Sequence, residues 1–270
     1  MTFANTSDTF RADTRQNKVA NRLAEALAQG GLTLVYQPEI DLVSREVTSL
    51  EALCRWHDEE LGQVAPDEFI AVAEARGLIV QIGQYLLNQV LADLPLLMQR
   101  WPQARVAINV SGVELALPDF AEQVTARIQA APMSLGQHLE FEVTESVFHH
   151  NVPVVRKNLL TLREAGLTIA IDDFGTGQSS LARLHTLPFD KIKLDRSFVQ
   201  ALEDPMVQAI VQAMVGLTRQ FSRTLVVEGI ETAQQMQHLV DLGCRVGQGY
   251  WLCKPCGLQD LPSHFSDSGH

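Results

Sequence analysis

Hydrophobic positions along the chain alternate between short runs typical of buried strands and longer segments with the spacing of amphipathic helices. The strand-like runs lie at residues 32–40, 47–56, 105–111, 138–146, 167–174, 191–198, 224–230 and 245–252. The helix-like segments lie at residues 19–28, 67–76, 78–99, 113–130, 152–165, 179–186, 203–221 and 232–242. Strands that alternate with helices predict right-handed βαβ crossovers and a parallel sheet. Because no linker interrupts the pattern, the sequence predicts an α/β fold, a single (β/α)8 barrel of the TIM type.

The start of this barrel is expected to be irregular. Residues 41–46 connect the first two strand-like runs, and a segment this short cannot hold a crossover helix. The first strand should therefore run antiparallel to the others. Residues 1–18 are polar and are predicted to be a disordered lead. The barrel domain is predicted over residues 19–262, followed by a flexible tail over residues 263–270.

The chain is strongly acidic, with a formal net charge of -11 at pH 7. A general binder of polymeric nucleic acid takes its affinity from a basic surface, so this charge argues against that class. An anionic substrate stays compatible with it if bound cations reverse the field locally. No run approaches the ~18 apolar residues of a membrane helix. Because the N-terminal residues also lack the apolar core of a signal peptide, a cytoplasmic protein is expected.

Polar residues recur with one parity near the carboxyl ends of the predicted strands. In a barrel strand, alternate side chains face the surrounding helices and the lumen. Residues such as Ile108 and Phe141 belong to the apolar, helix-facing set. The opposite parity holds the polar residues Glu51, Asn109, Glu142, Asp172, Lys193 and Glu228. Since active sites of TIM-type barrels lie at this end, these side chains are expected to converge on one mouth.

Clustered carboxylates in such a mouth would be difficult to ionise together without cations. Hard divalent ions such as Mg²⁺ or Mn²⁺ prefer carboxylate and amide oxygens. One ion could be held by Glu51, Asn109, Glu142 and Asp172. A second could use Asp172, Asp173 and Glu228, with Asp172 as the bridge. Two such ions suit an in-line displacement at a phosphodiester.

Each of these residues, taken alone, also has a structural interpretation. A single Glu in a strand is more often a surface or paired residue, and Asn109 could be a turn former at a strand end. Lys193 could be the partner of a carboxylate, and Lys191 with Glu140 could be a buried pair lower in the barrel. The repetition of polar residues in one register favours the functional interpretation of the set.

Cys253 and Cys256 form a C-x-x-C that has no second C-x-x-C or His pair to accompany it. A structural zinc site usually needs four such ligands. The pattern is therefore interpreted as two small residues around a turn, in preference to a metal or redox site.

Eight short motifs follow one another in a fixed order. Glu51-Ala52-Leu53 is followed by Arg55-Trp56. The others are YQP (36–38), INVS (108–111), EVTES (142–146), DDFGTGQSSL (172–181), KLDRSF (193–198), EGIET (228–232) and QGY (248–250). From about residue 19 to 258, the chain resembles the EAL-domain family of cyclic di-GMP phosphodiesterases.

The resemblance implies an enzyme that opens cyclic di-GMP to linear pGpG with Mg²⁺ or Mn²⁺, two ions to a site. It implies the two ligand sets given above and catalytic roles for Glu51, Asp172, Lys193 and Glu228. Lys193 would orient or polarise the attacking water, and Glu228 would be the general base. It also implies a barrel whose first strand is antiparallel to the rest.

Further residues match the family's substrate contacts and loop. Gln37, Arg55 and Gln248 resemble contacts to the substrate, with Arg55 on a phosphate. The residues of the glycine loop and its supports are Gly175, Thr176, Gly177, Glu145 and Glu231. A homodimer and a regulatory domain or partner are further expectations from the resemblance.

Three other classes of function fit the sequence less well. A catalytically silent receptor for cyclic di-GMP, or a protein-interaction module, would be expected to lack a metal ligand, the lysine or the loop. A nuclease acting on polymeric nucleic acid is disfavoured by the acidic charge. A protein kinase is excluded, because Asp173-Phe174-Gly175 has no glycine-rich loop or H-R-D element to accompany it.

Overall fold

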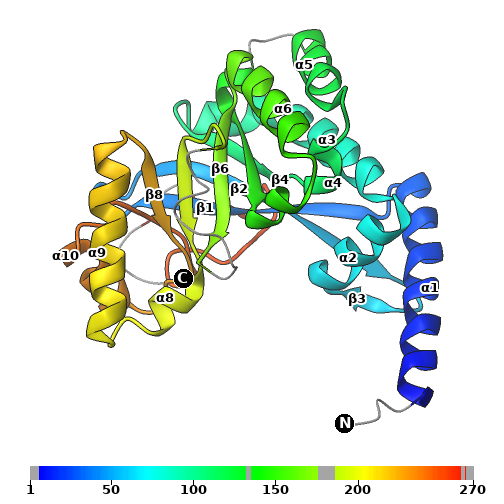
Figure 1. Cartoon of the computed structure of the whole chain (residues 1–270), viewed down its shortest axis with the longest axis horizontal. Coiled ribbons are helices and arrows are strands. Elements are labelled where there is room, and N and C mark those ends of the chain that lie inside the picture. The colour runs from blue at the N-terminus through cyan, green and yellow to red at the C-terminus, as the bar shows by residue number, and fades with distance from the viewer. Residues whose placement is uncertain (1–5, 132–134, 176–185, 263–264, 266–270) are drawn as a thin grey trace. The chain divides into compact units, whose positions relative to one another are not determined.

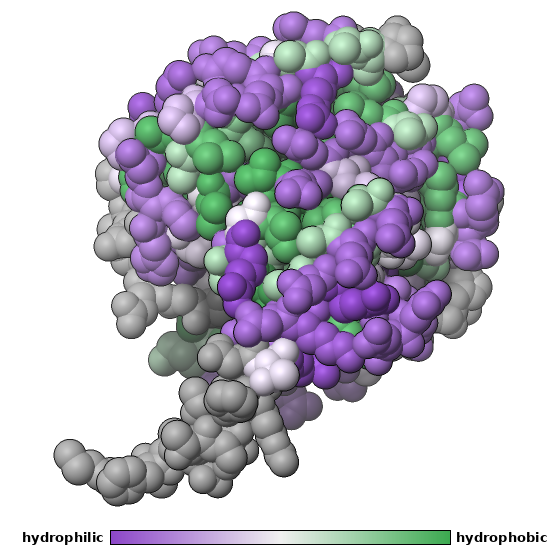
Figure 2. All heavy atoms as spheres, turned by 90° about the vertical axis from the view of Figure 1, so that its right-hand side faces the viewer, coloured by the Kyte–Doolittle hydropathy of each residue, from purple (hydrophilic) through white to green (hydrophobic). Residues whose placement is uncertain are grey.

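The computed structural model describes residues 6–131, 135–175, 186–262 and 265. The chain divides into two compact units, each built from two segments. The first unit contains the residues up to Leu34 together with Cys54–Asn88, and the second contains Val35–Leu53 together with the residues from Gln89 onward. No helix within the described ranges is both long and apolar enough to cross a membrane. The face of the molecule drawn in Figure 2 carries mostly hydrophilic side chains, with hydrophobic ones in smaller areas between them.

The second unit contains a closed barrel, apart from the first residues of β1 and the last residues of β2, which belong to the first unit. Its strands are β1 (Leu32–Asp41), β2 (Val47–Asp58), β4 (Arg105–Asn109), β5 (Leu139–Thr144), β6 (Thr168–Phe174), β7 (Lys191–Leu194), β8 (Thr224–Val227) and β9 (Val246–Gly247). Their order is β1-β9-β8-β7-β6-β5-β4-β2, and pairing between β1 and β2 closes the ring. The predicted TIM-type barrel is therefore confirmed.

The first strand is the irregular one, as predicted. β1 pairs with β9 in antiparallel fashion, with Ile40 opposite Gly247. The pairs from β2 through β4 to β9 are parallel. Because only a tight turn separates β1 from β2, with the Asp41 amide donating to the Glu46 carbonyl over 2.9 Å, the chain reverses direction there.

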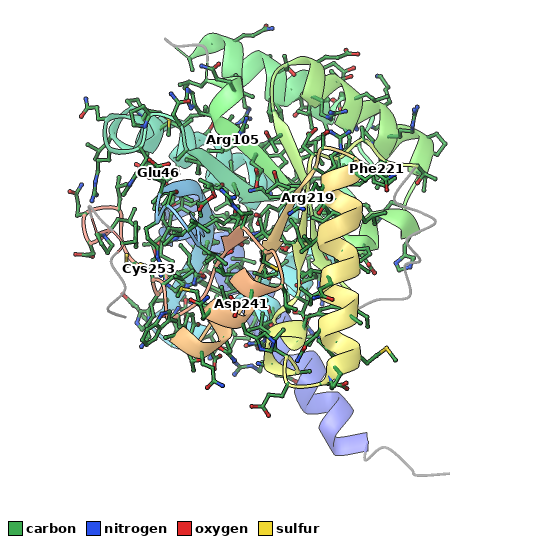
Figure 3. All side chains as sticks on the ribbon, turned by 90° about the vertical axis from the view of Figure 1, so that its left-hand side faces the viewer. Glu46, Arg105, Arg219, Phe221, Asp241 and Cys253 are labelled. Carbon is green, nitrogen blue, oxygen red and sulfur yellow. The ribbon has the colours of Figure 1, made fainter. Side chains whose placement is uncertain are left out.

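Helices cover the outside of this barrel. They are α4 (Gly112–Leu115), α5 (Phe120–Ala130), α6 (Val152–Glu164), α8 (Arg196–Gln200), α9 (Pro205–Gln220) and α10 (Ala233–Asp241), with 3₁₀ turns η1 (Gly136–His138) and η2 (Glu145–His149). Figure 1 shows α6 beside β6 and α9 beside β8. Arg219 and Phe221, labelled in Figure 3, lie at the end of α9, and Phe221 is 60% exposed. The apolar strand residues predicted to face the helices, including Ile108 and Phe141, are buried.

The first unit contains α1 (Thr6–Gln29), β3 (Gly62–Val64) and α2 (Pro66–Arg76). The long helix α3 (Ile79–Arg100) begins in this unit and continues into the second. β3 pairs in antiparallel fashion with the end of β2, where Trp56 lies opposite Val64. The ring of Trp56 packs edge-on against that of Phe69, with centroids 5.9 Å apart.

The N-terminal helix begins earlier than predicted. The sequence predicts helical spacing only from Val19, but α1 begins at Thr6, so residues 6–18 of the expected disordered lead are helical. Two charged side chains of this stretch find partners outside the helix. Arg15 forms an ion pair with Glu68, and Lys18 Nζ lies 2.7 Å from an oxygen of Glu60. The boundaries of the domain at residues 19 and 262 stay a prediction.

Two other element predictions need correction. The helix predicted over residues 113–130 is interrupted between α4 and α5, where Pro118 lacks an amide donor. The last strand is only Val246–Gly247, although the sequence predicts one over residues 245–252. Beyond Gly247 the backbone binds the loop at Ile230 instead, and a Cβ on Gly249 would lie 2.2 Å from the Ile230 nitrogen. The helix predicted at 179–186 lies outside the described residues except for Thr186.

Candidate metal centre

Lys193 lies at the centre of a ring of carboxylates inside the barrel. Its ammonium Nζ lies 2.7 Å from Glu228, 2.9 Å from Glu142, 3.4 Å from Asp172 and 3.6 Å from Glu51. The Lys193 side chain is fully buried, and Glu142 is 1% exposed. A single cation therefore faces four buried or largely buried acids.

Strand register explains why residues distant in sequence meet here. Asn109 at the end of β4 lies opposite Glu142 on β5, and Asp172 on β6 lies opposite Thr144 on β5. Glu228 follows directly after the last residue of β8. The alternation of side chains in each strand directs these groups into the lumen at the carboxyl end of the barrel.

Asp173 would point to the other face if β6 were regular, because consecutive strand residues alternate. The pairing of β6 with β7 shifts register between Ile171 and Phe174. Asp173 also adopts a positive φ of 52°. This bulge brings ligand atoms of Asp172, Asp173 and Glu228 within 4.8 Å of one another. The second of two adjacent acids is thus turned toward the same centre as the first.

Glu51 has the most complete set of hydrogen bonds in the centre. Asn109 Nδ2 donates to one carboxylate oxygen over 2.8 Å, and Gln248 Nε2 donates to the other over 2.8 Å. Burial alone would raise the pKa of Glu51, but Lys193 and these two amide donors lower it below the usual value. Glu51 is therefore ionised in the metal-free centre.

The other acids have the opposite tendency. Burial raises the pKa of Glu228 to about 8, although Lys193 opposes the shift. Burial and the neighbouring Asp172 raise the pKa of Asp173 to about 6. Burial likewise raises the pKa of Asp172, and that of Glu142 well above the usual value. The charge of one lysine does not offset that of so many acids. Additional positive charge would lower the pKa values of these carboxyl groups.

The donor set fits divalent cations. Ligand atoms of Glu51, Glu142 and Asp172 lie within 4.8 Å of one another, and Asp172 also belongs to the triple with Asp173 and Glu228. Oε2 of Glu142 is buried without a partner in the described structure, and Oε1 of Glu142 and Oδ1 of Asp172 contact only the Lys193 ammonium. Unsatisfied carboxylate oxygens at this spacing suit Mg²⁺ or Mn²⁺, so the residues present fit the predicted ions.

A cavity of about 200 Å³ opens beside these acids. Glu51, Glu228, Gln37 and Gln248 line it, as does Glu231. The other lining residues were not predicted as site residues: Leu53, Arg196, Gly229, Gly249 and Tyr250. Arg196 and Tyr250 lie within the KLDRSF and QGY motifs, which is the signal that could have identified them.

Gln37 and Gln248 connect the cavity wall to the acids. Gln248 Nε2 lies 3.1 Å from the side-chain oxygen of Gln37 and also donates to Glu51. Gln37 in turn donates to the backbone carbonyl of Cys253 over 3.0 Å. The two predicted substrate contacts thus lie in one hydrogen-bonded row that ends at Glu51.

The remaining predicted residues are less directly connected to the centre. Arg55 belongs to the first unit, where its guanidinium donates to the Cys54 carbonyl over 2.9 Å. The carboxylate oxygens of Glu145 are buried without a hydrogen-bond partner in the described structure. Gly175 has a φ of 104°, and a Cβ there would lie 2.4 Å from the Phe198 ring. Thr176 and Gly177 lie outside the described residues.

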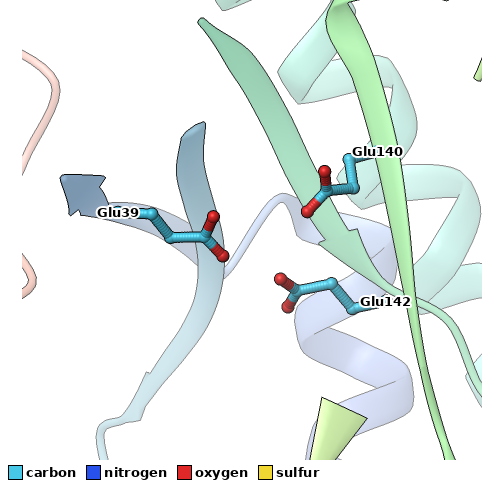
Figure 4. Close-up of side chains that lie close together, drawn as sticks. All are labelled: Glu39, Glu140 and Glu142. Atoms are coloured by element: carbon cyan, nitrogen blue, oxygen red, sulfur yellow. The ribbon is translucent and has the colours of Figure 1, made fainter. Parts of the chain in front are cut away.

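A second layer of charge lies among Glu39, Glu140 and Lys191. Lys191 Nζ lies 2.6 Å from Glu140 and 2.5 Å from Glu39. The pair of Lys191 with Glu140 was predicted, whereas Glu39 was not. Figure 4 shows the carboxylates of Glu39, Glu140 and Glu142 turned toward one another from β1 and β5. Because Lys191 already bridges the first two acids, this layer is an ion-pair network.

The chain matches the EAL domain family over residues 20–255. It therefore belongs to the EAL domain family, as its motifs predicted. A curated relative from Pseudomonas aeruginosa, named as a cyclic di-GMP phosphodiesterase, is 38% identical over 95% of this chain and 43% of its own length. The chain thus spans less than half of that relative.

Solved structures agree with this assignment. The structure of the MucR phosphodiesterase in complex with c-di-GMP has a TM-score of 0.84 at 34% identity, covering 91% of this chain and all of that one (100%). The EAL enzyme Bd1971, solved with cAMP and cyclic di-GMP bound, has a TM-score of 0.85 at 31% identity, covering 92% of this chain and 68% of the other. Both relatives hold cyclic di-GMP in those structures.

Proposed function

We propose that this chain is a metal-dependent phosphodiesterase that hydrolyses cyclic di-GMP to linear pGpG. The observation that carries the proposal is the pair of carboxylate triples that share Asp172, arranged around Lys193. Two ions in such triples would bind the scissile phosphate and activate a water at neutral pH. The phosphodiesterase names of the relatives and the cyclic di-GMP in the related structures support the choice of substrate.

The residues of the centre would hold the two ions and orient the attacking water. Glu51, Asn109, Glu142 and Asp172 would hold one ion, and Asp172 with Asp173 and Glu228 the other. Four acids raise the pKa of Lys193 well above its usual value despite burial, so its ammonium stays charged at neutral pH. Lys193 would therefore orient the attacking water by donating a hydrogen bond.

Glu228 is the best candidate for the general base. Burial raises the pKa of Glu228 to about 8 in the metal-free centre, so this carboxylate binds a proton more tightly than an exposed glutamate does. Its oxygen lies 2.7 Å from Lys193, so base and orienting group are adjacent. We propose that Glu228 receives the proton of the water that Lys193 orients.

Gln37 and Gln248 would contact the substrate from the cavity wall, and Arg55 would contact a phosphate. Glu145 and Glu231 would support the loop that includes Gly175, Thr176 and Gly177. A homodimer and a separate regulatory domain or partner are also part of the proposal, as is a cytoplasmic location. The part of the curated relative outside the match leaves ample length for such a domain.

The decisive experiment is incubation of the purified chain with cyclic di-GMP and Mg²⁺ or Mn²⁺, with chromatographic detection of pGpG. We expect pGpG to accumulate with metal and none to form with EDTA. Absence of product with either ion, while cyclic di-GMP still binds in calorimetry, would favour the alternative of a catalytically silent receptor. Absence of both would reject the substrate.

A further inference from the structure

The C-x-x-C of Cys253 and Cys256 has no role in the proposed chemistry, yet it lies beside the row of side chains that ends at Glu51. Cys253, labelled in Figure 3, follows the short last strand of the barrel. Its carbonyl accepts the side-chain amide of Gln37 over 3.0 Å. One hydrogen bond therefore separates the backbone of this pair from a residue that lines the cavity.

The second cysteine is bound to the same strand. Cys256 forms an isolated antiparallel bridge with Tyr36 on β1. The Tyr36 amide donates to the Cys256 carbonyl over 2.8 Å, and the Cys256 amide donates to the Tyr36 carbonyl over 3.1 Å. Tyr36 and Gln37 are adjacent, so both cysteines hold neighbouring residues of β1. A change in the backbone of residues 253–256 must reach β1 directly.

The two thiols differ in their access to solvent. Cys253 is 5% exposed, whereas Cys256 is partly exposed. The Cys253 thiol donates to the Lys254 carbonyl over 3.2 Å, and the neighbouring Cys256 side chain contributes to the raised pKa of Cys253. A partly exposed thiol with a buried thiol three residues away is an arrangement in which a mixed disulfide on the first is resolved by the second.

We propose that Cys253 and Cys256 are a dithiol site, which a small-molecule disulfide converts into an intrachain disulfide, and that this modification loosens Gln37 and Gln248 in the cavity. The predicted effect on the binding of cyclic di-GMP rests on the proposed function. The formation of the disulfide does not.

The reaction balances with oxidised glutathione as the oxidant. The Cys256 thiolate attacks one glutathione sulfur, the glutathione disulfide breaks, and one glutathione thiolate leaves. Cys253 then loses its proton and attacks Cys256 sulfur, which releases the second glutathione. Two protein thiols are oxidised, one disulfide is reduced to two thiols, and the protons lost by the cysteines are taken up by the leaving groups.

Closure changes the geometry of the turn. The sulfurs of Cys253 and Cys256 must approach until they are about 2.05 Å apart. Because Cys253 is buried and Cys256 is held by Tyr36 on both its amide and its carbonyl, part of the movement falls on the backbone. The carbonyls of these two cysteines are the acceptors for Gln37 and Tyr36, so at least one of the two contacts to β1 weakens.

Burial slows the oxidation of the two thiols. Burial and the neighbouring Cys256 raise the pKa of Cys253 to about 12, and burial also raises the pKa of Cys256. Since the thiolate is the attacking form, oxidation is slow at neutral pH and accelerates as the pH rises. The reduced pair should therefore survive brief exposure to an oxidant at neutral pH and be oxidised only by prolonged exposure.

Tryptic digestion of the native chain tests the first part of the proposal. Lys254 is followed by Pro255, which blocks cleavage, so one peptide from Val246 onward contains both cysteines, while Cys54 and Cys244 fall on other peptides. After treatment with oxidised glutathione and alkylation, we expect this peptide to lose the mass of two hydrogens, faster at pH 9 than at pH 7. Continued alkylation of both thiols at pH 9, or a lasting glutathione adduct on Cys256, would overturn the proposal.

Two matched variants identify the roles of the thiols. Cys253→Ser should trap glutathione on Cys256, because the resolving thiol is absent. Cys256→Ser should acquire no adduct under the same conditions, because Cys253 is buried. Circular dichroism establishes that both variants are folded. An adduct on Cys253 in the second variant, equal to that on Cys256 in the first, would contradict the order of attack.

Hydrogen exchange tests the coupling to β1 without any ligand. The peptide that contains Tyr36 and Gln37 should exchange faster in the oxidised chain than in the reduced chain, and Cys256→Ser should show no response to glutathione. Unchanged exchange there would refute the coupling. In a second arm, oxidation should weaken the binding of cyclic di-GMP several-fold, with recovery after reduction by dithiothreitol. Equal affinity of both forms would refute the consequence, whereas absence of binding in the reduced form would instead reject the proposed function.

Discussion

Lys193 Nζ lies 2.7 Å from Oε1 of Glu228 and also within ion-pair distance of three further acids. The lysine is fully buried, so the electrostatic balance of the centre depends on it when no metal is bound.

Replacement of this lysine should weaken both folding and catalysis. In Lys193→Met, the acids lose their buried cation, and loss of one partner of a buried ion pair costs about 3–5 kcal/mol in the free energy of unfolding. Urea denaturation in EDTA measures this loss, and Mn²⁺ should restore part of it. Hydrolysis should fall below detection, because the group that orients water is absent.

The matched control is Lys157→Met. Lys157 forms an exposed ion pair with Glu122 at 2.9 Å, and solvent screening leaves such pairs with little effect on stability. Equal stability of the two variants in EDTA would contradict the central position of Lys193.

Removal of the shared ligand should abolish hydrolysis and leave the fold intact. Asp172 belongs to both carboxylate triples, so Asp172→Asn should also lose the rise in melting temperature that Mn²⁺ produces in the parent chain. Glu51→Ala should lose hydrolysis as well, since Glu51 belongs to one triple. Glu203→Gln, a change of an exposed acid, serves as the control. Retained turnover in either site variant would refute the ligand assignment.

The affinity for divalent ions should rise steeply with pH. Asp173 and Glu228, with pKa values of about 6 and about 8, must lose their protons before they bind a cation. Titration calorimetry with Mg²⁺ between pH 5.5 and about 8.5 should show tighter binding at each step, with proton release. A pH-independent affinity would contradict the assignment.

The stability of the metal-free chain should change with pH in the opposite direction. Glu228 has a pKa of about 8 in the folded chain against 4.5 as the reference value, so the folded state binds this proton more tightly. Stability therefore falls as the pH rises from about 4.5 to about 8, and saturating Mg²⁺ should reverse the trend. Melting curves in EDTA and in Mg²⁺ across this range provide the measurement.

The second layer of charge, formed by Glu39, Glu140 and Lys191, should stabilise the fold. Lys191→Met leaves Glu39 and Glu140 buried without their cation and should cost about 3–5 kcal/mol. Glu39→Gln should cost less, because an amide oxygen still accepts a hydrogen bond from Lys191. Urea denaturation compares the two variants. A stability of Lys191→Met within about 1 kcal/mol of the parent would show that the layer is dispensable.

The period of the strands explains what could be predicted from sequence. Because side chains alternate strictly in a regular strand, the parity of Glu142 and Lys193 was enough to place both in the lumen. Glu39 was not predicted, because the first strand runs antiparallel and its parity does not follow from that of the parallel strands. It shares that parity with Gln37, and both are buried.

Irregular geometry was harder to predict. Strict alternation would turn Asp173 away from the centre, and only the bulge with its positive φ turns it back. The early end of the last strand depends on the close approach of Gly249 to Ile230, a tertiary contact without a local signal. The early part of α1 has its charged partners outside the helix, as in the ion pair of Arg15 with Glu68, and periodicity does not report such contacts.

The buried ammonium of Lys193 has a consequence for the order of assembly. With an internal cation already among the acids, the barrel would fold without metal, and metal binding would be a separate, later step on a folded protein. When divalent ions are scarce, the protein would then be folded and metal-free, not unfolded. Supply of metal would set how many molecules are active at a given moment, without any change in how many are present.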